Sequence, residues 1–350
     1  MLHRRKFIAT AVSATVVSLI PNSATPNFLS IPKTNTLLKG KRLKKGDTIG
    51  LIAPGYALSA ESLQKAIETV RKMGFVPYHT ARIVGNYGYF SNTDEERAKD
   101  LNEMFANPKI DGILCARGGY GCTRIMQMID YEIIKSNPKV LIGFSDITTL
   151  LNAFYKEVGL VCFHGPVGTT LDDDYSMSQL EQVVVHPTKN LLIKNASLSE
   201  EQKKDVEYNR HIITPGKAKG IIIGGSLTLI NALIGTPHEL DFTNKIVCIE
   251  DVEEAPYRID RMLTQLIEGK TFRKAAGIVI GVCAGCNASS NSKSFTLKEV
   301  LLDRIKPLNI PAVYGMSFGH ISNNFTFPIG IKAKLNTAKM TLKITDTAVL

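Results

Sequence analysis

The chain has 350 residues, 44% of them hydrophobic, and carries a net charge of +10 at pH 7. A chain of this length and composition can bury a large core and has room for about two domains, which excludes intrinsic disorder. The basic residues are spread along the chain, no basic run interleaves with aromatic residues, and tryptophan is absent. The charge therefore favours encounters with anionic ligands but predicts no nucleic-acid partner.

Residues 1–24 have the pattern of an export signal. Arg4 and Arg5 precede an apolar stretch, residues 7–20, that contains no acidic residue. This is typical of a twin-arginine signal, and we expect cleavage near Ala24. The stretch is short and rich in serine, threonine and alanine, which argues against a permanent membrane span after signal removal and leaves an uncleaved anchor as the alternative. An exported, periplasmic protein is expected.

Residues 43–170 alternate between strand and helix patterns. Strands are expected over residues 47–53, 110–116, 139–144 and 160–163. Apolar residues between them recur at helical spacing, including one helix expected to run from Ile125 to Ile133, and Thr93 with Glu96 forms a capping-box pattern. Strands joined by single helices predict a mostly parallel sheet in a Rossmann-like α/β domain.

The following stretch, residues 171–215, is polar, begins near three successive aspartates and has few apolar positions, so it is interpreted as a linker. Residues 216–350 return to strand and helix patterns, with a Gly-Gly-Ser turn at residues 224–226 and short β segments towards the C-terminus. This region predicts a second, mixed α/β domain that contains β-sheet. No repeat of fixed period occurs, so solenoids and propellers are not expected.

Ser145 stands at an abrupt junction between the apolar run 139–144 and a helix-like stretch that begins at Ile147. A nucleophilic serine usually lies on a sharp strand-to-helix turn. The turn places the hydroxyl above the edge of the sheet and directs helical N–H groups towards a nearby oxygen. The same pattern is equally typical of an ordinary helix N-cap. Position alone does not separate the two interpretations.

Candidate partners for such a serine occur in the second half of the chain. Glu250 ends a strand-like run, and His320 lies in a loop bracketed by glycines. Acyl transfer needs a base, a group that orients the base, and donors for the oxyanion. The candidate base is His320, and the candidate orienting group is Glu250. The candidate donors are the backbone N–H groups of Asp146 and of Gly118 or Gly119. Two alternatives remain: Glu250 begins an acidic cluster that could be a solvated face or a cation site, and His164 competes for the role of base.

Metal and cofactor sites have weak support. Of the six cysteines, only Cys283 and Cys286 have pair spacing; they could form a disulfide in an exported protein, whereas a metal would require a second pair. The glycine-rich loop 117–121 could hold a phosphate, but it lacks both the dinucleotide and the Walker spacing. We expect neither a metal nor a cofactor.

Several motifs in order resemble the L,D-carboxypeptidase family of serine peptidases, from about residue 43 to residue 335. These motifs are Arg117-Gly-Gly-Tyr-Gly121, Ile142-Gly-Phe-Ser-Asp-Ile147, Phe163-His-Gly-Pro166, Gly224-Gly-Ser-Leu-Thr228, Cys248-Ile-Glu-Asp251 and Tyr257-Arg-Ile-Asp260. The resemblance implies Ser145 as nucleophile, Glu250 as orienting carboxylate and His320 as base, in a homodimer without metal or cofactor. Two features depart from the family: Ser226 stands where asparagine is common, and the better-known murein-recycling members have no signal.

These observations lead to the hypothesis of an exported serine L,D-carboxypeptidase. It would release the terminal D-alanine from peptidoglycan tetrapeptides, with an acyl-enzyme on Ser145 and with Arg117 as a candidate contact for the substrate carboxylate. Within the enzyme class, the alternative is an immunity-type amidase that cleaves peptide-nucleotide antibiotics. From another class, an exported two-domain solute-binding protein would also fit the composition.

Overall fold

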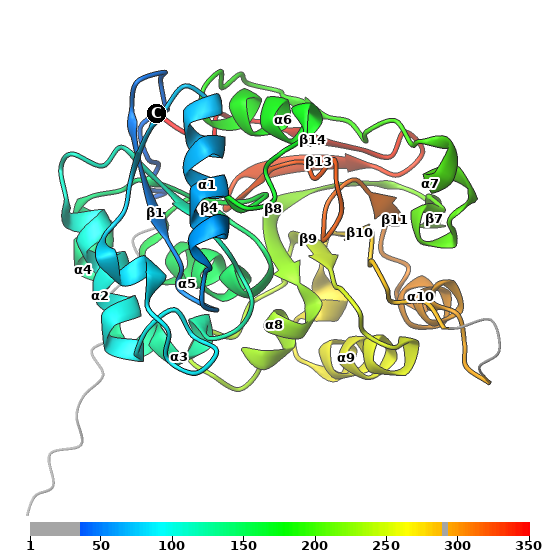
Figure 1. Cartoon of the computed structure of the whole chain (residues 1–350). Helices are drawn as coiled ribbons and strands as arrows, with labels where there is room; N and C mark the ends of the chain where they lie inside the picture. The colour runs from blue at the N-terminus through cyan, green and yellow to red at the C-terminus, as the bar shows by residue number, and fades with distance from the viewer. Residues whose placement is uncertain (1–35, 289–292) are drawn as a thin grey trace, which may run out of the picture. The chain divides into compact units, whose positions relative to one another are not determined.

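Two β-sheets organise the chain, as the computed structural model shows (Figure 1). The structure describes residues 36–288 and 293–350, so the expected export signal lies outside the described residues. The six-stranded sheet has the order β12-β5-β4-β3-β1-β2, and the eight-stranded sheet has the order β6-β14-β13-β8-β9-β10-β11-β7.

The elements follow one another in the order strand, helix, strand over most of the chain. The strands are β1 Thr48–Ile52, β2 Val76–Tyr78, β3 Gly112–Cys115, β4 Val140–Gly143, β5 Cys162–His164, β6 Leu192–Ile193, β7 His211–Thr214, β8 Lys217–Ser226, β9 Lys245–Glu250, β10 Gly277–Gly281, β11 Ala312–Met316, β12 Phe327–Ile329, β13 Lys332–Asn336 and β14 Thr341–Ile344. The α-helices are α1 Ala60–Lys72, α2 Asp94–Ala106, α3 Cys122–Ile125, α4 Tyr131–Ser136, α5 Thr148–Val158, α6 Asp174–Val184, α7 Glu200–Lys204, α8 Leu227–Ala232, α9 Pro256–Glu268 and α10 Leu297–Ile305. Six short 3₁₀ turns are η1 Ala81–Val84, η2 Met126–Met128, η3 Ser145–Ile147, η4 Val206–Tyr208, η5 Phe272–Lys274 and η6 Lys306–Leu308.

The first sheet confirms the expected Rossmann-like α/β fold. Strands β2, β1, β3, β4 and β5 are parallel, and β3 and β4 are buried at every position. Parallel strands covered on both faces read as continuous apolar runs, which explains the sequence pattern here. Helix α2 begins where the capping pattern predicted, because the Thr93 side chain accepts a hydrogen bond from the backbone N–H of Glu96.

The second sheet is mixed, because it contains both parallel and antiparallel strand pairs. Strands β8, β9, β10 and β11 are parallel, whereas β13, β14 and β6 extend the β8 edge and β7 extends the β11 edge in antiparallel pairing. One C-terminal strand does not join this sheet. Strand β12 instead pairs antiparallel with β5, so a segment from the end of the chain completes the first sheet.

The stretch 171–215 differs from the expected linker, because it contains helix α6 and strands of the second sheet. Leu180, Val183 and Val184 of α6 are buried in the core, β6 pairs with β14, and β7 pairs with β11. The polar residues have a local cause: Asp173, for example, caps α6 by accepting a hydrogen bond from the N–H of Ser176 at 2.8 Å. Polarity here marks helix ends and not a free linker.

The helix expected from Ile125 to Ile133 is also interrupted. Ile129 is extended, and α4 begins anew at Tyr131. The side chain of Asp130 accepts hydrogen bonds from the N–H groups of Glu132 and Ile133, both at 3.0 Å. A capping aspartate inside an apolar helical pattern therefore starts a new helix.

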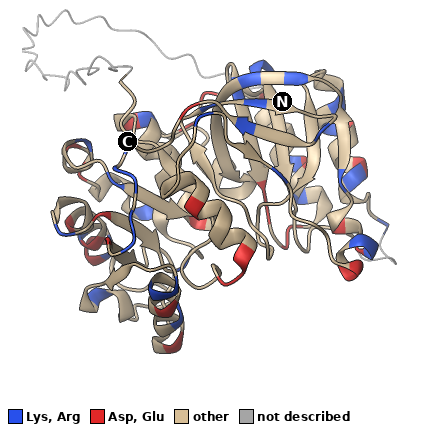
Figure 2. Ribbon diagram, turned by 90° about the horizontal axis from the view of Figure 1, so that it is seen from above, with Lys and Arg blue, Asp and Glu red and all other residues tan. Residues whose placement is uncertain are grey.

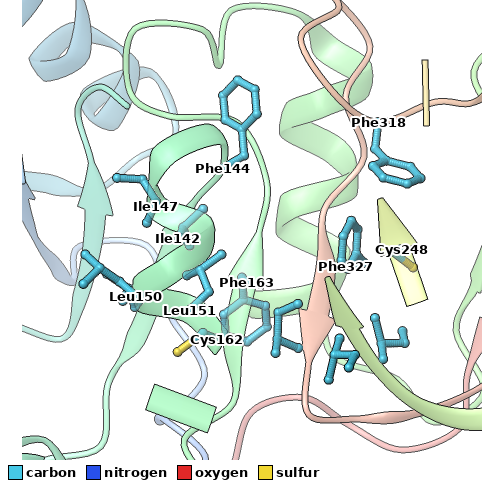
Figure 3. Packing of buried hydrophobic residues seen from close by; sticks show 14 of the residues in the cluster. Ile142, Phe144, Ile147, Leu150, Leu151, Cys162, Phe163, Cys248, Phe318 and Phe327 are labelled. Carbon is cyan, nitrogen blue, oxygen red and sulfur yellow. The ribbon is translucent and has the colours of Figure 1, made fainter. Parts of the chain in front are cut away.

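Large aromatic side chains fill the core between the two sheets (Figure 3). Phe144, Phe163, Phe318 and Phe327 are all buried, and Phe318 and Phe327 pack with ring centroids 5.2 Å apart. Acidic and basic residues are interspersed over the ribbon (Figure 2), in agreement with the spread charge of the sequence. Within residues 36–288 and 293–350, no helix has both the length and the hydropathy that a membrane crossing requires.

Candidate active site

Ser145 occupies a sharp turn at the end of a buried strand. Strand β4 ends at Gly143, Phe144 is extended, and Ser145 itself has φ of 61°, in the left-handed region that favours glycine. The turn is tight: a Cβ on Gly143 would lie 2.9 Å from a side-chain carbon of Ile147. A non-glycine residue held in this region stores backbone strain, which is common at functional sites.

The hydroxyl of Ser145 contacts a histidine and does not cap the helix. His320 Nε2 lies 3.0 Å from Ser145 Oγ, and His320 Nδ1 lies 2.8 Å from Glu250 Oε2. No side-chain cap bond is present at the start of this turn. Because a carboxylate can only accept, Nδ1 carries the proton, and Nε2 is left as the acceptor for the serine O–H. The structure therefore joins three residues that are up to 175 positions apart.

The ends of two parallel strands of the second sheet bring the partners to Ser145. Glu250 is the last residue of β9, and His320 follows β11 in the loop that contains Gly319. Gly319 has φ of 121°, and a Cβ there would lie 3.2 Å from Glu250 Oε2. The same Cβ would lie 2.6 Å from the backbone oxygen of Val282, so the positive φ and this close backbone contact favour glycine here.

The electrostatics of the three residues are coupled. Burial favours a neutral Glu250, but the charge of His320, the nearby His164 and the hydrogen bond with His320 outweigh burial and lower the pKa of Glu250 to about 2. For His320, burial favours the neutral ring, and the charge of Glu250 outweighs it, so the pKa of His320 is raised. An ionised, buried carboxylate beside the imidazole fixes its tautomer and stabilises the imidazolium.

Asp251, the acidic residue that follows Glu250, does not belong to a solvated face. Asp251 is buried and accepts hydrogen bonds from the backbone N–H and the hydroxyl of Thr228, each at 2.8 Å. Burial, followed by the nearby charge of Glu250, raises the pKa of Asp251 to about 6. Asp251 thus fastens the first turn of α8 to the end of β9.

The residues expected around the oxyanion lie beside Ser145. A Cβ on Gly118 would lie 3.1 Å from Ser145 Cβ and 3.4 Å from its hydroxyl oxygen. Gly119 has φ of 103°, and a Cβ there would lie 2.4 Å from the ring of Tyr56. Asp146 directly follows the serine, and its buried Oδ2 accepts a hydrogen bond from the N–H of Cys122 at 2.9 Å. The glycine loop after β3 therefore meets the turn after β4.

Arg117 lies at the start of this glycine loop, as predicted. It is exposed, it donates a hydrogen bond to the carbonyl of Ala57 at 3.0 Å, and its guanidinium lies 5.8 Å from the centre of the Tyr56 ring. The exposure leaves the cation within reach of solvent and of an anionic ligand.

His164, the competing candidate for the base, does not hydrogen-bond to Ser145. It ends β5, is fully buried, and lies on the far side of Glu250, with Nε2 3.9 Å from Glu250 Oε1. His320 holds the position that a base requires.

Sequence reasoning missed the residues that fix Ser145 relative to the second sheet. Thr148 Oγ1 accepts a hydrogen bond from the N–H of Ser226 at 3.0 Å, and Asn152 bonds to Gly224. Gly225 is part of this contact, since a Cβ there would lie 2.3 Å from Thr148 Oγ1. The only signal was the Gly-Gly-Ser sequence, which indicates a close backbone approach but not its partner.

Cys283 and Cys286 are buried free thiols. A hydrogen bond with Cys286, followed by burial, raises the pKa of Cys283, so its thiol is protonated and is a poor nucleophile. Among residues 36–288 and 293–350, no group of three or more histidine, cysteine, aspartate or glutamate side chains is placed to hold a metal ion.

A Rossmann-like sheet that carries a strained serine, hydrogen-bonded to a histidine and a buried glutamate, defines a serine-type hydrolase. The chain belongs to the LD-carboxypeptidase family, Peptidase S66: residues 49–165 match the family's N-terminal domain, and residues 219–335 match its C-terminal domain. The chain is therefore a serine-type carboxypeptidase, and the solute-binding alternative is not supported.

Three relatives illustrate the similarity. A probable murein peptide carboxypeptidase of Bacillus subtilis is 38% identical over 87% of this chain and 94% of its own length. The crystal structure of a muramoyltetrapeptide carboxypeptidase from Oxalobacter formigenes has a TM-score of 0.74 at 27% identity and covers 85% of this chain and 99% of its own. A MccF-like protein from Bacillus anthracis has a TM-score of 0.77 at 27% identity, with coverage of 88% and 99%.

Proposed function

We propose that the protein releases the terminal D-alanine from peptidoglycan tetrapeptides through an acyl-enzyme on Ser145. The observation that carries this proposal is the hydrogen-bonded series from Ser145 Oγ through His320 to Glu250, with distances of 3.0 and 2.8 Å. Relatives that are named murein peptide and muramoyltetrapeptide carboxypeptidases support the substrate class.

In the first half of the reaction, Ser145 Oγ attacks the carbonyl carbon of the scissile bond, and its proton passes to His320 Nε2. The backbone N–H groups of Asp146 and of Gly118 or Gly119 stabilise the oxyanion. Collapse breaks the C–N bond, and the departing amine of D-alanine takes the proton from His320. Glu250 stabilises the imidazolium while it exists and remains ionised throughout.

In the second half, water attacks the ester carbon as His320 accepts its proton. The bond to Ser145 Oγ then breaks, and the serine recovers the proton from His320. Arg117 supplies an exposed cation for the terminal carboxylate of the substrate, which orients the bond so that one chirality presents its carbonyl to Ser145.

A second candidate function is the cleavage of peptide-nucleotide conjugates by an immunity-type amidase. Exposed aromatic rings adjoin the glycine loop: Tyr89 is 56% and Tyr120 42% exposed, their ring centroids are 6.0 Å apart, and Tyr56 lies between Gly119 and Tyr89. An exposed aromatic ring can stack on a nucleobase. Similarity to the microcin C7 self-immunity protein MccF of Escherichia coli, which is 27% identical over 87% of this chain, supports the same candidate.

Matched tetrapeptides separate these functions. One peptide ends in a bond from an L-centre to D-alanine, and its control ends in L-alanine; free D-alanine is followed with D-amino-acid oxidase, and both digests are examined by mass spectrometry. Release from the first peptide alone is the expected result. Equal cleavage of both would contradict the L,D assignment. Cleavage of a peptide-nucleotide with neither tetrapeptide cleaved would favour the amidase.

Export and assembly belong to the same proposal. The twin-arginine pattern of residues 1–24 supports export to the periplasm, and the family resemblance supports a homodimer. Changing both Arg4 and Arg5 to lysine should retain the protein in the cytoplasmic fraction, whereas unchanged export would contradict a twin-arginine route. Light scattering on the purified enzyme should give the mass of two chains, and the mass of one chain would exclude the dimer.

A further inference from the structure

His164 is a buried histidine immediately behind the catalytic carboxylate. It has 0% exposure, and its backbone is fixed between Gly143 of β4 and Phe327 of β12, which pair with it on either side. The imidazole stacks on the ring of Phe327 at a centroid distance of 4.5 Å and forms T-shaped pairs with the rings of Phe144 and Phe318, each at a centroid distance of 6.0 Å. Figure 3 shows the side chains of these three phenylalanines. Three aromatic rings therefore pack against the imidazole.

Among the residues that the structure describes, neither ring nitrogen of His164 has a hydrogen-bond partner, and one oxygen of Glu250 has none either. Glu250 uses Oε2 for His320, while its Oε1 is buried and unpaired. A neutral imidazole always carries one N–H, and a buried unpaired donor beside a buried unpaired acceptor costs free energy on both sides. His164 Nε2 lies 3.9 Å from Glu250 Oε1, which is too long for a hydrogen bond.

The geometry favours a direct contact between these two atoms. A water that bridged them by hydrogen bonds of ordinary length would hold them roughly 4.5 Å or more apart, so 3.9 Å leaves no room for one. A displacement of about 1 Å would bring them to hydrogen-bond distance. Because β5 and β12 hold the backbone of the histidine, the Glu250 carboxylate is the group that moves. It rotates while its Oε2 keeps the hydrogen bond with His320.

We propose that His164 is a positioning residue that donates its Nε2–H to Glu250 Oε1 and so holds the carboxylate in line with His320. The inference rests on the proposed catalytic roles of Ser145, His320 and Glu250. The contact sets the rotation of the Glu250 carboxylate, whose two oxygens then serve the two histidines. The donated N–H also compensates part of the negative charge of Glu250, so that His320 is exposed to a weaker negative charge.

The second effect provides a readout that packing alone would not change. The acidic groups that act on His320 are Glu250 at the end of β9 and Asp251 and Glu253 in the loop that follows, and all three favour its charged form. Ser145 occupies its other nitrogen. Removal of the His164 donor leaves the charge of Glu250 less compensated, so the imidazolium becomes more stable. The acidic limb of the activity should therefore move to higher pH.

The experiment measures the rate at which a fluorophosphonate probe labels Ser145 as a function of pH, in the full-length enzyme. His164→Leu removes the donor, His164→Gln places an N–H at nearly the same reach, and His164→Asn keeps the amide but is too short. Phe325→Leu is the control, because Phe325 belongs to the same cluster, with its ring centroid 5.3 Å from that of Phe318 and 6.2 Å from that of Phe327, but has no ring contact with His164 among the described residues. Each variant is also compared by thermal unfolding.

We expect His164→Leu and His164→Asn to label about 10- to 100-fold more slowly, with the acidic midpoint shifted upward. His164→Gln should return most of the rate and the original midpoint. Phe325→Leu should unfold at a lower temperature with an unchanged pH profile. An acidic midpoint that does not rise in His164→Asn, or a glutamine variant no better than the asparagine variant, would overturn the inference. A wild-type enzyme that is not labelled at Ser145 would instead refute the proposed function.

Discussion

The side chain of Asn152 and the backbone of Gly224 hydrogen-bond to each other in both directions. Asn152 Nδ2 donates to the Gly224 carbonyl at 2.8 Å, and the Gly224 N–H donates to Asn152 Oδ1 at 3.2 Å. Asn152 belongs to α5, the helix that follows Ser145, and Gly224 belongs to β8, the neighbour of the strand that ends in Glu250. This amide thus holds the nucleophile of one sheet in register with the carboxylate of the other.

Asn152→Ala should destabilise the protein strongly. The variant leaves a donor and an acceptor of Gly224 unpaired in the interior, so we expect the free energy of unfolding to fall by about 2–4 kcal/mol. Denaturant unfolding measures this change. Asn86→Ala, at an exposed loop position, is the control and should change it by less than about 0.5 kcal/mol. Equal effects of the two substitutions would contradict the role of Asn152.

Local sequence patterns predicted the secondary structure that carries the site residues. The apolar run before Ser145 predicted a buried strand and a sharp turn, and a second apolar run predicted that Glu250 ends a strand. Each of these signals is local, because strand period and turn chemistry depend on neighbours in the chain. The carboxyl ends of parallel strands lie at one edge of a sheet, where functional side chains commonly gather. The placement of Ser145 and Glu250 at strand ends was therefore predictable.

Contacts between distant segments were not predictable in the same way. The pairing of β12 with β5, which fixes His164, joins residues more than 160 positions apart, and no local pattern records it. The Asn152 contact with Gly224 is of the same kind. The stretch 171–215 appeared to be a linker because its capping aspartates outweigh a few buried side chains in composition, although those side chains decide its packing.

Ser145→Ala should abolish turnover and leave the fold intact. The loss of a triad member usually costs about three to six orders of magnitude in rate, and alanine removes only a hydroxyl from a half-buried position. Tetrapeptide hydrolysis and thermal unfolding measure the two effects. A variant that keeps more than a small fraction of the activity would show that Ser145 merely forms the turn.

Chelators should not affect the rate. Among residues 36–288 and 293–350 no cluster of metal-binding side chains exists, and the proposed steps need only Ser145, His320 and Glu250. Dialysis against EDTA, followed by the tetrapeptide assay, tests this expectation. Activity that is lost with EDTA and returns with zinc would contradict the serine mechanism.

Asp251 should make the protein less stable as the pH rises. Its pKa in the folded state is about 6, above the ordinary value of 3.8 for an aspartate, so the folded state favours the protonated form. The raised pKa adds on the order of 3 kcal/mol to the free energy of unfolding. This stabilisation is fully present below pH 3.8 and is lost as the pH rises through 6. The difference in unfolding free energy between wild type and Asp251→Asn, measured at pH 4 and pH 7, should shift by this amount in favour of the variant. A difference that is equal at both pH values would show that the pKa of Asp251 is the same in the folded and unfolded states.

Glu250→Gln should slow the reaction and move its acidic limb to lower pH. The charge of Glu250 overcomes burial and raises the pKa of His320, so its removal lets that pKa fall, and the neutral base then persists to lower pH. The amide still reaches His320 but cannot fix the productive tautomer, and a loss of about 10³- to 10⁴-fold in kcat is expected, with a smaller change in KM. A pH profile of kcat/KM with the defined tetrapeptide measures both effects. Asp251→Asn is the control, because Asp251 contacts Thr228 and not His320, and it should retain most of the rate. A greater loss of rate in Asp251→Asn than in Glu250→Gln would transfer the orienting role to Asp251.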